Sequence, residues 1–461
     1  MAAPRPRFSF ERPLLVIDVV GLRPKDLADA PRMSALADRG RHGPLTTIVP
    51  AVTCSVQATI LTGVLPREHG IVGNGWYFRD LAQVWFWRQS NRLVQAKEVY
   101  DWGRDAKRGF RCAKLFWWFN MYSDAAISLT PRPQYFANGL KLPGLYSRPA
   151  PLADEIETEL GPFPLFQFWG PGAGIASSRW IVDASIRTLE HERPDLALVY
   201  VPHLDYDHQR YGPDDPRSRA AVRAVDGEIG RLLDKALELG MEVLILSEYG
   251  IEAVQRAVEP NRELRQAGYL TTQATAHGEL LDCGASRAFA VCDHQIAHVY
   301  VEHDRDLAGV RRTLEGIDGV ARVLDRGEQR ELGLDHDRSG QLVALAEPTC
   351  WFAYYYWLDE KHRPDFATTV DIHRKPGYDP AELFLDPALR LPKAKIAWNL
   401  LKKRLGFRYL MDVISTSPVQ VRGSHGLLPS NPDLGPLFLA TPGLKLPAAP
   451  RVDTLLFEHD D

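Results

Sequence analysis

The sequence predicts an α/β protein whose core is a mostly parallel β-sheet flanked by helices. Three short apolar runs, each of a length that suits one buried strand, lie at 14–19, 196–201 and 243–246. Amphipathic stretches at 177–190 and 217–239 have the period of helices and stand next to two of these runs in the chain. Strands that alternate with helices in this way are typical of parallel sheets. We therefore expect an α/β core with its ligand site beyond the carboxyl ends of the strands.

The composition is that of an ordinary globular protein. Of 461 residues, 45% are hydrophobic and 25% are charged, and the net charge of -4 gives no basic footprint for duplex nucleic acid. No stretch approaches the roughly 18 uninterrupted apolar residues of a membrane span. The five cysteines are odd in number and scattered, which favours a reduced, cytoplasmic compartment. We interpret residues 1–12 as a leader, and nothing in the sequence indicates an oligomeric state.

The first predicted strand, 14–19, carries Asp18 near its carboxyl end, with apolar residues on both sides. These flanks disfavour a surface or capping role, and the end of a strand is a suitable place for a ligand-binding acid. A short helix is expected next, at 31–40, with Met33 and Leu36 on its apolar face.

Residues 50–75 are the stretch around which we expect the site to be built. They indicate a short helix that begins at Thr53 and ends near Gly63, followed by a loop marked by Pro66 and several glycines. A threonine hydroxyl at a helix N-terminus lies beside backbone N–H groups that have no intrahelical partner, at the positive end of the helix dipole. This environment suits a phosphoryl group. The alternative is that Thr53 only caps the helix.

Residues 76–171 are dense in aromatic side chains, in runs such as VWFWRQ and KLFWWFNMY. Aromatic clusters of this kind usually pack in a core or under a lid. The functional alternative is a surface on which a nucleobase or another flat or apolar leaving group stacks. We interpret the stretch as an aromatic-rich insertion in the core.

The second predicted strand, 196–201, runs into a cluster of polar side chains. The segment PHLDYDHQRYGP contains His203, Asp205, Asp207 and His208. Zn²⁺ and similar ions take carboxylate and imidazole ligands, so the cluster is a candidate metal site. The alternative is a polar loop that caps the helix at 217–239. The third strand ends in Ser-Glu-Tyr-Gly, which adds Glu248 and Tyr249.

A second, α+β module is predicted beyond Gly250, and we set its bounds at 261–409. Its expected elements are a strand at 288–301, a helix at 306–316, a strand at 320–325 and a strand pair at 341–348 and 351–359. His294 and His298 stand at even spacing on the first of these strands, as metal ligands or as ordinary half-buried residues. His373, Arg374 and Lys375 either meet substrate anions or form a solvated turn.

The last part of the chain is expected to return to the first domain, so that the core spans 13–260 and 410–461. Gly-Ser-His-Gly at 423–426 places His425 in a loop of small residues after the strand-like VQVRG. A loop of this kind is common. The loop is informative only because His425 follows the other candidate residues in the chain.

The spacing of Thr53, Thr62, Gly63, Pro66 and His69 resembles the nucleophile segment of the alkaline phosphatase superfamily, in its nucleotide pyrophosphatase/phosphodiesterase branch. The resemblance covers residues from about 12 to 260 and from about 410 to 445, and the module at 261–409 matches the family's cap only in position. It implies an alkaline phosphatase-like core that hydrolyses a phosphodiester or pyrophosphate bond in a small phosphate-containing substrate, through a phospho-threonine intermediate at Thr53.

The resemblance also implies two divalent metal ions, zinc first, with iron or manganese as alternatives. The nucleophile-side ion would take Asp18, Thr53 and Glu248, with Tyr249 as a further candidate. The other ion would take Asp205, His425 and either His208 or a cap histidine such as His294. Asn74, His373 and Arg374 are candidate substrate-binding residues.

Four positions depart from the family's pattern. Val56 replaces an asparagine, Gln209 replaces a histidine, and Glu248 and Tyr249 replace an adjacent aspartate and histidine. The departures keep other functions open: a phosphomonoesterase, phosphonate hydrolase or phosphotransferase of the same superfamily, or a catalytically silent binding protein on this scaffold.

Overall fold

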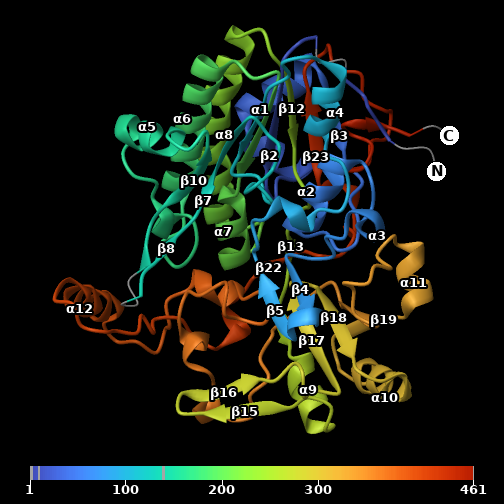
Figure 1. Cartoon of the computed structure of the whole chain (residues 1–461), viewed down its shortest axis with the longest axis vertical. Coiled ribbons are helices and arrows are strands. Elements are labelled where there is room, and N and C mark those ends of the chain that lie inside the picture. The colour runs from blue at the N-terminus through green and yellow to red at the C-terminus, as the bar shows by residue number, and fades with distance from the viewer. Residues whose placement is uncertain (1–3, 9–10, 138–140, 460–461) are drawn as a thin grey trace.

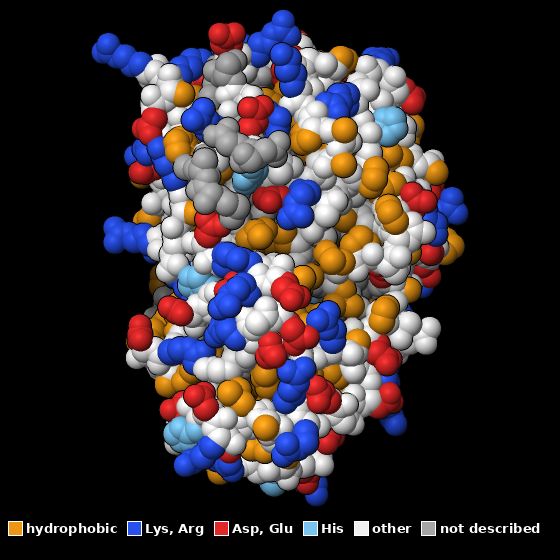
Figure 2. Space-filling view, turned by 90° about the vertical axis from the view of Figure 1, so that its right-hand side faces the viewer, with side chains coloured by type: hydrophobic (Ala, Val, Ile, Leu, Met, Phe, Trp, Pro, Cys, Tyr) orange, Lys and Arg blue, Asp and Glu red, His pale blue; other side chains and the backbone are white. Residues whose placement is uncertain are grey.

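The computed structural model describes residues 4–8, 11–137 and 141–459. Figure 1 shows a large sheet with helices on its two sides in the upper part of the molecule, and smaller sheets with short helices in the lower part. The predicted α/β fold is thereby confirmed. Basic and acidic side chains are interspersed over the face seen in Figure 2, in keeping with the nearly balanced charge.

Eight strands form the central sheet, in the order β10-β7-β6-β11-β2-β12-β23-β3. They are β2 (Leu14–Val19), β3 (Arg41–Pro44), β6 (Cys112–Leu115), β7 (Ile127–Pro131), β10 (Leu145–Arg148), β11 (Leu196–Val201), β12 (Glu242–Leu246) and β23 (Leu437–Ala440). The five strands from β7 to β12 run parallel, and antiparallel strands close both edges. Every residue of β2 and β11 is buried, and each buried Leu, Ile or Val contributes about 1.5–3 kcal/mol to folding.

The helices of this core are α1 (Pro31–Arg39), α2 (Thr53–Thr62), α3 (Pro66–His69), α4 (Val99–Ala106), α5 (Leu152–Leu160), α6 (Ile175–Glu192), α7 (His203–Tyr211) and α8 (Pro216–Glu238). In Figure 1, α6 and α8 lie on one side of the sheet and α2 and α4 on the other. The segment 203–211, for which we expected a metal-binding cluster or a polar loop, forms the helix α7.

The aromatic-rich stretch at 76–171, which we interpreted as an insertion, contributes part of the central sheet. Three strands from it, β6, β7 and β10, are members of the central sheet, because their apolar residues pack into the main core. The expected leader also has structure where it is described: β1 (Arg5–Pro6) pairs with β24 (Phe457–Glu458). Residues 1–3 and 9–10 of the leader lie outside the described residues.

The second part contains a four-stranded antiparallel sheet in the order β17-β18-β20-β19. The helices and main strands of this second part are α9 (Pro260–Gln266), β17 (Ala288–Asp293), β18 (Ile296–Val301), α10 (Asp304–Glu315), β19 (Val320–Leu324), α11 (Arg326–Glu331), β20 (Leu342–Ala346), β21 (Cys350–Phe352) and α12 (Pro392–Arg404). Two-residue strands β13 (Glu252–Ala253) and β22 (Gly423–Ser424) pair near its junction with the core. The boundaries of 261–409 stay a prediction.

The remaining strands form short two-stranded pairs. They are β4 (Gly75–Phe78) with β5 (Gln83–Phe86), β8 (Gln134–Tyr135) with β9 (Lys141–Leu142), β14 (Arg256–Val258) with β21, and β15 (Thr272–Thr275) with β16 (Gly278–Leu281).

Three local predictions for the second part and the tail are wrong. The strand expected at 288–301 is the hairpin β17–β18, whose turn contains His294 in the left-handed region at φ 61°. The strand pair expected at 341–348 and 351–359 is not a pair, because β20 joins the four-stranded sheet whereas β21 pairs with β14. The strand-like VQVRG begins in a 3-10 turn, and only Gly423 and Ser424 form a strand.

Candidate active site

Thr53 is the first residue of α2, at the edge where the parallel strands end. Val52 is the N-cap with extended backbone, and the N–H of Cys54 donates to Asn74 Oδ1 at 2.9 Å. Thr53 is 3% exposed, and its Oγ1 lies 3.0 Å from Tyr249 Oη. The predicted start of the helix is confirmed, whereas the role of the hydroxyl stays a prediction.

Asp18, the penultimate residue of β2, and Glu248, two residues after β12, form a pair of buried carboxyl groups at the ends of neighbouring strands. Gln57 joins them: its Nε2 lies 3.1 Å from Asp18 Oδ2 and 2.6 Å from Glu248 Oε1. Burial raises the pKa of Asp18 to about 7, and burial together with repulsion from Asp18 raises the pKa of Glu248 well above its ordinary value. Both groups therefore hold protons far more readily than exposed carboxylates.

The orientation of the Gln57 amide follows from its other contact. The backbone N–H of Trp118 donates to Gln57 Oε1 at 2.8 Å. A backbone N–H can only donate, so the amide oxygen must face Trp118 and the NH₂ group must face the two carboxyl groups. Sequence reasoning missed Gln57. The available signal was its spacing, because a residue four positions after Thr53 lies on the same face of the helix.

Asp205 and His425 form a second group. Asp205 lies in the first turn of α7, directly after β11, and His425 follows β22. His425 Nδ1 lies 2.8 Å from the carbonyl oxygen of Ala51, so that nitrogen carries the proton and Nε2 carries a lone pair. Asp205 Oδ1 and His425 Nε2 are 4.0 Å apart, and neither has a hydrogen-bond partner among the described residues. Burial raises the pKa of Asp205 to about 7 and lowers that of His425 to about 3.

Four rings stack across the junction between the core and the second part. Tyr249 lies on His425 with ring centroids 3.5 Å apart, His425 lies on His294 at 3.6 Å, and His294 lies on Tyr378 at 3.8 Å. The expected cap histidine thus reaches the site, but from a hairpin turn. His298 lies elsewhere: its Nε2 is 2.8 Å from the carbonyl oxygen of Val72.

Two further candidates differ from expectation. His208 is buried in α7, and neither of its ring nitrogens has a hydrogen-bond partner among the described residues, so no hydrogen bond joins it to Asp205. Asn74 connects α2 to β17, because its backbone and side-chain N–H groups donate to the Asp293 carboxylate at 2.8 and 3.0 Å.

The three candidate residues at 373–375 lie in different environments. His373 lines a large cavity beside Thr53, and its Nδ1 lies 3.4 Å from the Phe86 carbonyl oxygen. Arg374 is exposed and pairs with Asp365 at 3.3 Å, which is the solvated-turn alternative. Lys375 is fully buried, with Asp379 at 2.7 Å and Glu382 at 2.8 Å.

The cavity beside Thr53 has a volume of about 600 Å³ and a mostly apolar lining. Thr53, Asp205 and His294 stand at one part of this lining. Aromatic residues form much of the remainder, among them Trp87, Phe116, Trp118, Trp169 and Tyr206. Both interpretations of the aromatic stretch therefore apply to neighbouring residues: Trp117 is fully buried in the main core, whereas Trp118 lines the cavity.

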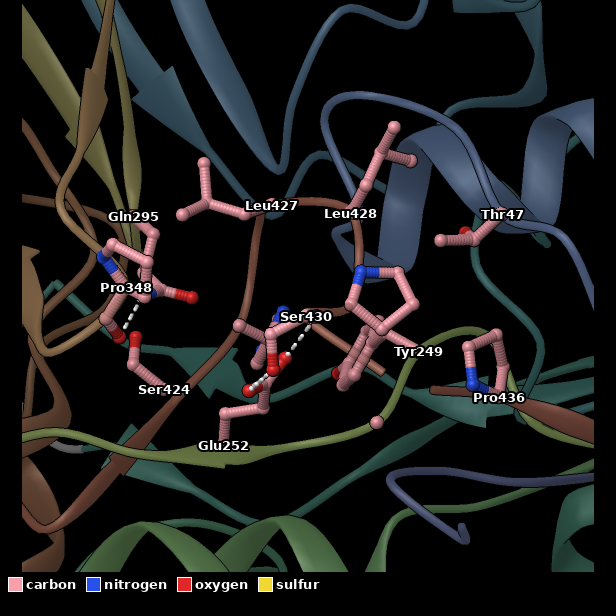
Figure 3. Close-up of a pocket in the computed structure, with 13 residues that line it drawn as sticks. Thr47, Tyr249, Glu252, Gln295, Pro348, Ser424, Leu427, Leu428, Ser430 and Pro436 are labelled. Carbon is pink, nitrogen blue, oxygen red and sulfur yellow. Dashed lines mark hydrogen bonds between the residues drawn. The ribbon is translucent and has the colours of Figure 1, made fainter. Parts of the chain in front are cut away.

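A second pocket, of about 90 Å³, lies on the other side of the ring stack. Tyr249 and His425 line it, while their stacking partner His294 lines the large cavity. Figure 3 shows Ser430 beside Glu252, to which the Ser430 hydroxyl donates at 2.6 Å. The loop that follows His425 thus closes this side of the site.

Within the described ranges, no three side chains of His, Cys, Asp or Glu are arranged so that they could hold a metal ion. None of the helices among those residues combines the length and the apolarity that crossing a membrane requires.

Comparison with known sequences finds a single family over most of the chain. The sequence model of the type I phosphodiesterase / nucleotide pyrophosphatase family matches residues 14–379. An uncharacterized pyrophosphatase/phosphodiesterase of Schizosaccharomyces pombe is 23% identical over 298 residues, which are 62% of this chain and 53% of that protein. Human ectonucleotide pyrophosphatase/phosphodiesterase family member 1 is 20% identical over 220 residues, 44% of this chain and 19% of that protein. The chain therefore spans about half or less of these relatives.

Solved structures show the same fold. Phosphonoacetate hydrolase from Sinorhizobium meliloti, in complex with phosphonoformate, has a TM-score of 0.59 at 16% identity and covers 98% of this chain and 94% of its own. An inactive threonine-to-alanine variant of murine ectonucleotide pyrophosphatase / phosphodiesterase 5, in complex with AMP, has a TM-score of 0.58 at 15% identity, with coverages of 96% and 92%.

Proposed function

Because the chain belongs to the type I phosphodiesterase / nucleotide pyrophosphatase family of the alkaline phosphatase superfamily, we propose that it hydrolyses a phosphodiester or pyrophosphate bond at Thr53. The observation that carries the proposal is the position of Thr53, at the N-terminus of α2 and on the wall of the 600 Å³ cavity. The helix N-terminus favours the phosphoryl oxygens, and the apolar wall accepts the leaving group.

The proposed reaction has two displacements at phosphorus. Thr53 Oγ1 forms a bond to phosphorus while the bond to the leaving oxygen breaks, and water then attacks the phospho-threonine and restores the hydroxyl. The Thr53 proton passes to Tyr249 Oη, 3.0 Å away, and onward to Asp205, which lines the same cavity as Thr53. Tyr249 remains a neutral phenol between turnovers, because burial and the nearby carboxylates raise its pKa well above 10.

The family is generally metal-dependent, and the two groups of candidate ligands fit an ion differently. Asp205 Oδ1 and His425 Nε2 are a carboxylate oxygen and an imidazole lone pair, 4.0 Å apart and without partners, which suits one divalent ion of the zinc, iron or manganese type. An ion held there would supply positive charge to a phosphoryl oxygen. Asp18 and Glu248 fit an ion less well, since the Gln57 NH₂ group occupies the point between Asp18 Oδ2 and Glu248 Oε1.

The test compares the wild-type protein with Thr53→Ala on bis-p-nitrophenyl phosphate. We expect Thr53→Ala to lose activity by about 10³-fold or more, because a covalent nucleophile is removed. Thr158→Ala, at an exposed position of α5, is the matched control and should keep wild-type activity. Full activity of a folded Thr53→Ala protein contradicts the proposal. Phosphomonoesters, phosphonates and acceptor alcohols in the same assay separate the other hydrolases and a phosphotransferase.

One observation favours a second candidate function, that of a binding protein without turnover. Gln209 and Tyr249 stand where the family resemblance implies histidines, and both are neutral hydrogen-bonding groups here. Titration calorimetry with AMP and with p-nitrophenyl phosphate tests it: binding by a wild-type protein that hydrolyses none of the substrates favours this alternative, and turnover excludes it.

A further inference from the structure

We infer that the side-chain amide of Gln57 takes the place of the nucleophile-side metal ion, so that this chain holds at most one divalent ion, on the Asp205 side of Thr53. In this arrangement Asp18 and Glu248 are not ligands. They accept hydrogen bonds from the amide, which belongs to the residue one helical turn after Thr53.

The first argument is the position of the amide. Gln57 Nε2 lies 3.1 Å from Asp18 and 2.6 Å from Glu248, which are the two carboxyl groups that an ion at this point would need. An N–H donor aimed at both oxygens occupies the space between them and repels a cation. The hydrogen bond from the Trp118 backbone fixes which end of the amide faces the pair, and Gln57 is only 1% exposed. An ion could enter only after a buried, doubly anchored side chain had moved.

The second argument is independent of Gln57. An ion beside Thr53 would draw on the side chain that follows Glu248, and here that residue is Tyr249. Its hydroxyl is engaged by Thr53 at 3.0 Å, and its ring lies flat on His425, with 8° between the planes. Turning the phenol toward Asp18 would break both contacts. A neutral phenol is also a weak ligand for Zn²⁺ compared with imidazole.

The third argument concerns charge. Two buried carboxyl groups without a partner are disfavoured, and a hydrogen bond from the Gln57 amide to each of them lowers that cost. The amide therefore gives each carboxyl group one hydrogen-bond donor without an ion. Each carboxyl group gives one oxygen to the amide, and the other oxygens, Asp18 Oδ1 and Glu248 Oε2, have no partner among the described residues.

The experiment counts ions in the full-length protein, so its outcome does not depend on whether the proposed hydrolysis occurs. Protein is incubated with excess Co²⁺, passed through a desalting column, and analysed by plasma mass spectrometry and by visible absorption of the bound Co²⁺. We expect wild type to carry no more than one ion per chain. Asp18→Asn should leave that number unchanged, and His425→Ala should remove any ion that wild type holds.

Gln57→Ala opens the space between Asp18 and Glu248 and should raise the count by one ion per chain. Gln329→Ala is the matched control: this buried amide donates to the Gly340 carbonyl oxygen at 3.1 Å in the second part, and its loss should not alter the count. Two ions per wild-type chain, loss of an ion in Asp18→Asn, or an unchanged count in a folded Gln57→Ala protein would each overturn the inference. If Gln57→Ala fails to fold, the comparison of wild type with Asp18→Asn decides.

Discussion

At the scale of single residues, the site is built from neutral hydrogen-bonding groups where the family resemblance implies ligands. Tyr249 Oη lies 3.0 Å from Thr53 Oγ1, and Gln57 links Asp18 to Glu248. Both links start from α2, one helical turn apart. The Thr53 hydroxyl thus has a hydrogen-bonding contact that the protein supplies without an ion.

Replacing the Tyr249 hydroxyl tests the first of these links. Tyr249→Phe keeps the ring that stacks on His425 but removes the path by which the Thr53 proton leaves. We expect kcat on bis-p-nitrophenyl phosphate to fall by about 10²-fold, within the range of general acid–base effects, with little change in KM. Tyr354→Phe is the control, since the Tyr354 hydroxyl is buried without a hydrogen-bond partner among the described residues. Equal kcat values for the two variants would exclude a relay through Tyr249.

At the scale of elements, α2 carries the site, and its C-terminus fixes where the helix lies. Gly63 ends the helix in the left-handed conformation, with φ 70°. A Cβ at this position would lie 2.5 Å from Cγ of Phe457, the residue with which β24 packs against the core. Backbone conformation and packing therefore both require glycine here.

Gly63→Ala should lower the free energy of unfolding by about 1–3 kcal/mol, because strain at positive φ adds to a clash with a buried ring. Gly227→Ala is a matched control with the opposite expected sign: Gly227 lies inside α8, and no neighbouring atom comes within 4 Å of its Cβ position. Alanine there should stabilise the helix by up to about 1 kcal/mol. Urea unfolding of the three proteins gives both values, and equal midpoints for wild type and Gly63→Ala would show that the contact with Phe457 is relieved at little cost.

The elements also show what could be predicted from sequence. The strands β2 and β11 match the predicted bounds, because continuous apolar runs between polar segments identify buried parallel strands. The run 288–301 has the same appearance, but its turn at His294 and Gln295 contains neither glycine nor proline, so the hairpin was not visible. For the same reason His294 was assigned to a strand, although the turn is what brings it onto His425. Gln57 was missed because its role depends on Trp118, a contact between distant parts of the chain.

At the scale of the whole molecule, the candidate site lies where the central sheet meets the second part. Tyr249 and His425 come from the core, and His294 and Tyr378 come from the segments around β17 and beyond β21, so the stack joins the two parts. Asn74 also connects the two parts, because it donates two hydrogen bonds to Asp293 in β17. The stability of the fold is therefore coupled to the ionisation of groups in the site.

This coupling predicts a pH dependence of stability in the absence of metal. The folded-state pKa values of Asp18 and Asp205 are about 7, above the ordinary value of 3.8, because burial disfavours their charged forms. Between pH 4 and 7 the folded protein thus holds protons that the unfolded chain has released, and the free energy of unfolding must fall as pH rises through this window. The total loss should be on the order of a few kcal/mol. Urea unfolding with EDTA at pH 5, 6 and 7.5 measures it.

Two controls identify the groups responsible. Asp18→Asn and Asp205→Asn cannot ionise, so each should flatten the pH dependence relative to wild type, whereas Asp154→Asn, at an exposed position of α5, should not. Zn²⁺ added at pH 7.5 should raise the unfolding midpoint of wild type and of Asp18→Asn but not that of Asp205→Asn, since binding to the folded state alone stabilises it. A midpoint that rises from pH 5 to 7.5 in EDTA would contradict the burial of these carboxyl groups without cations, and with it the electrostatic account of the site.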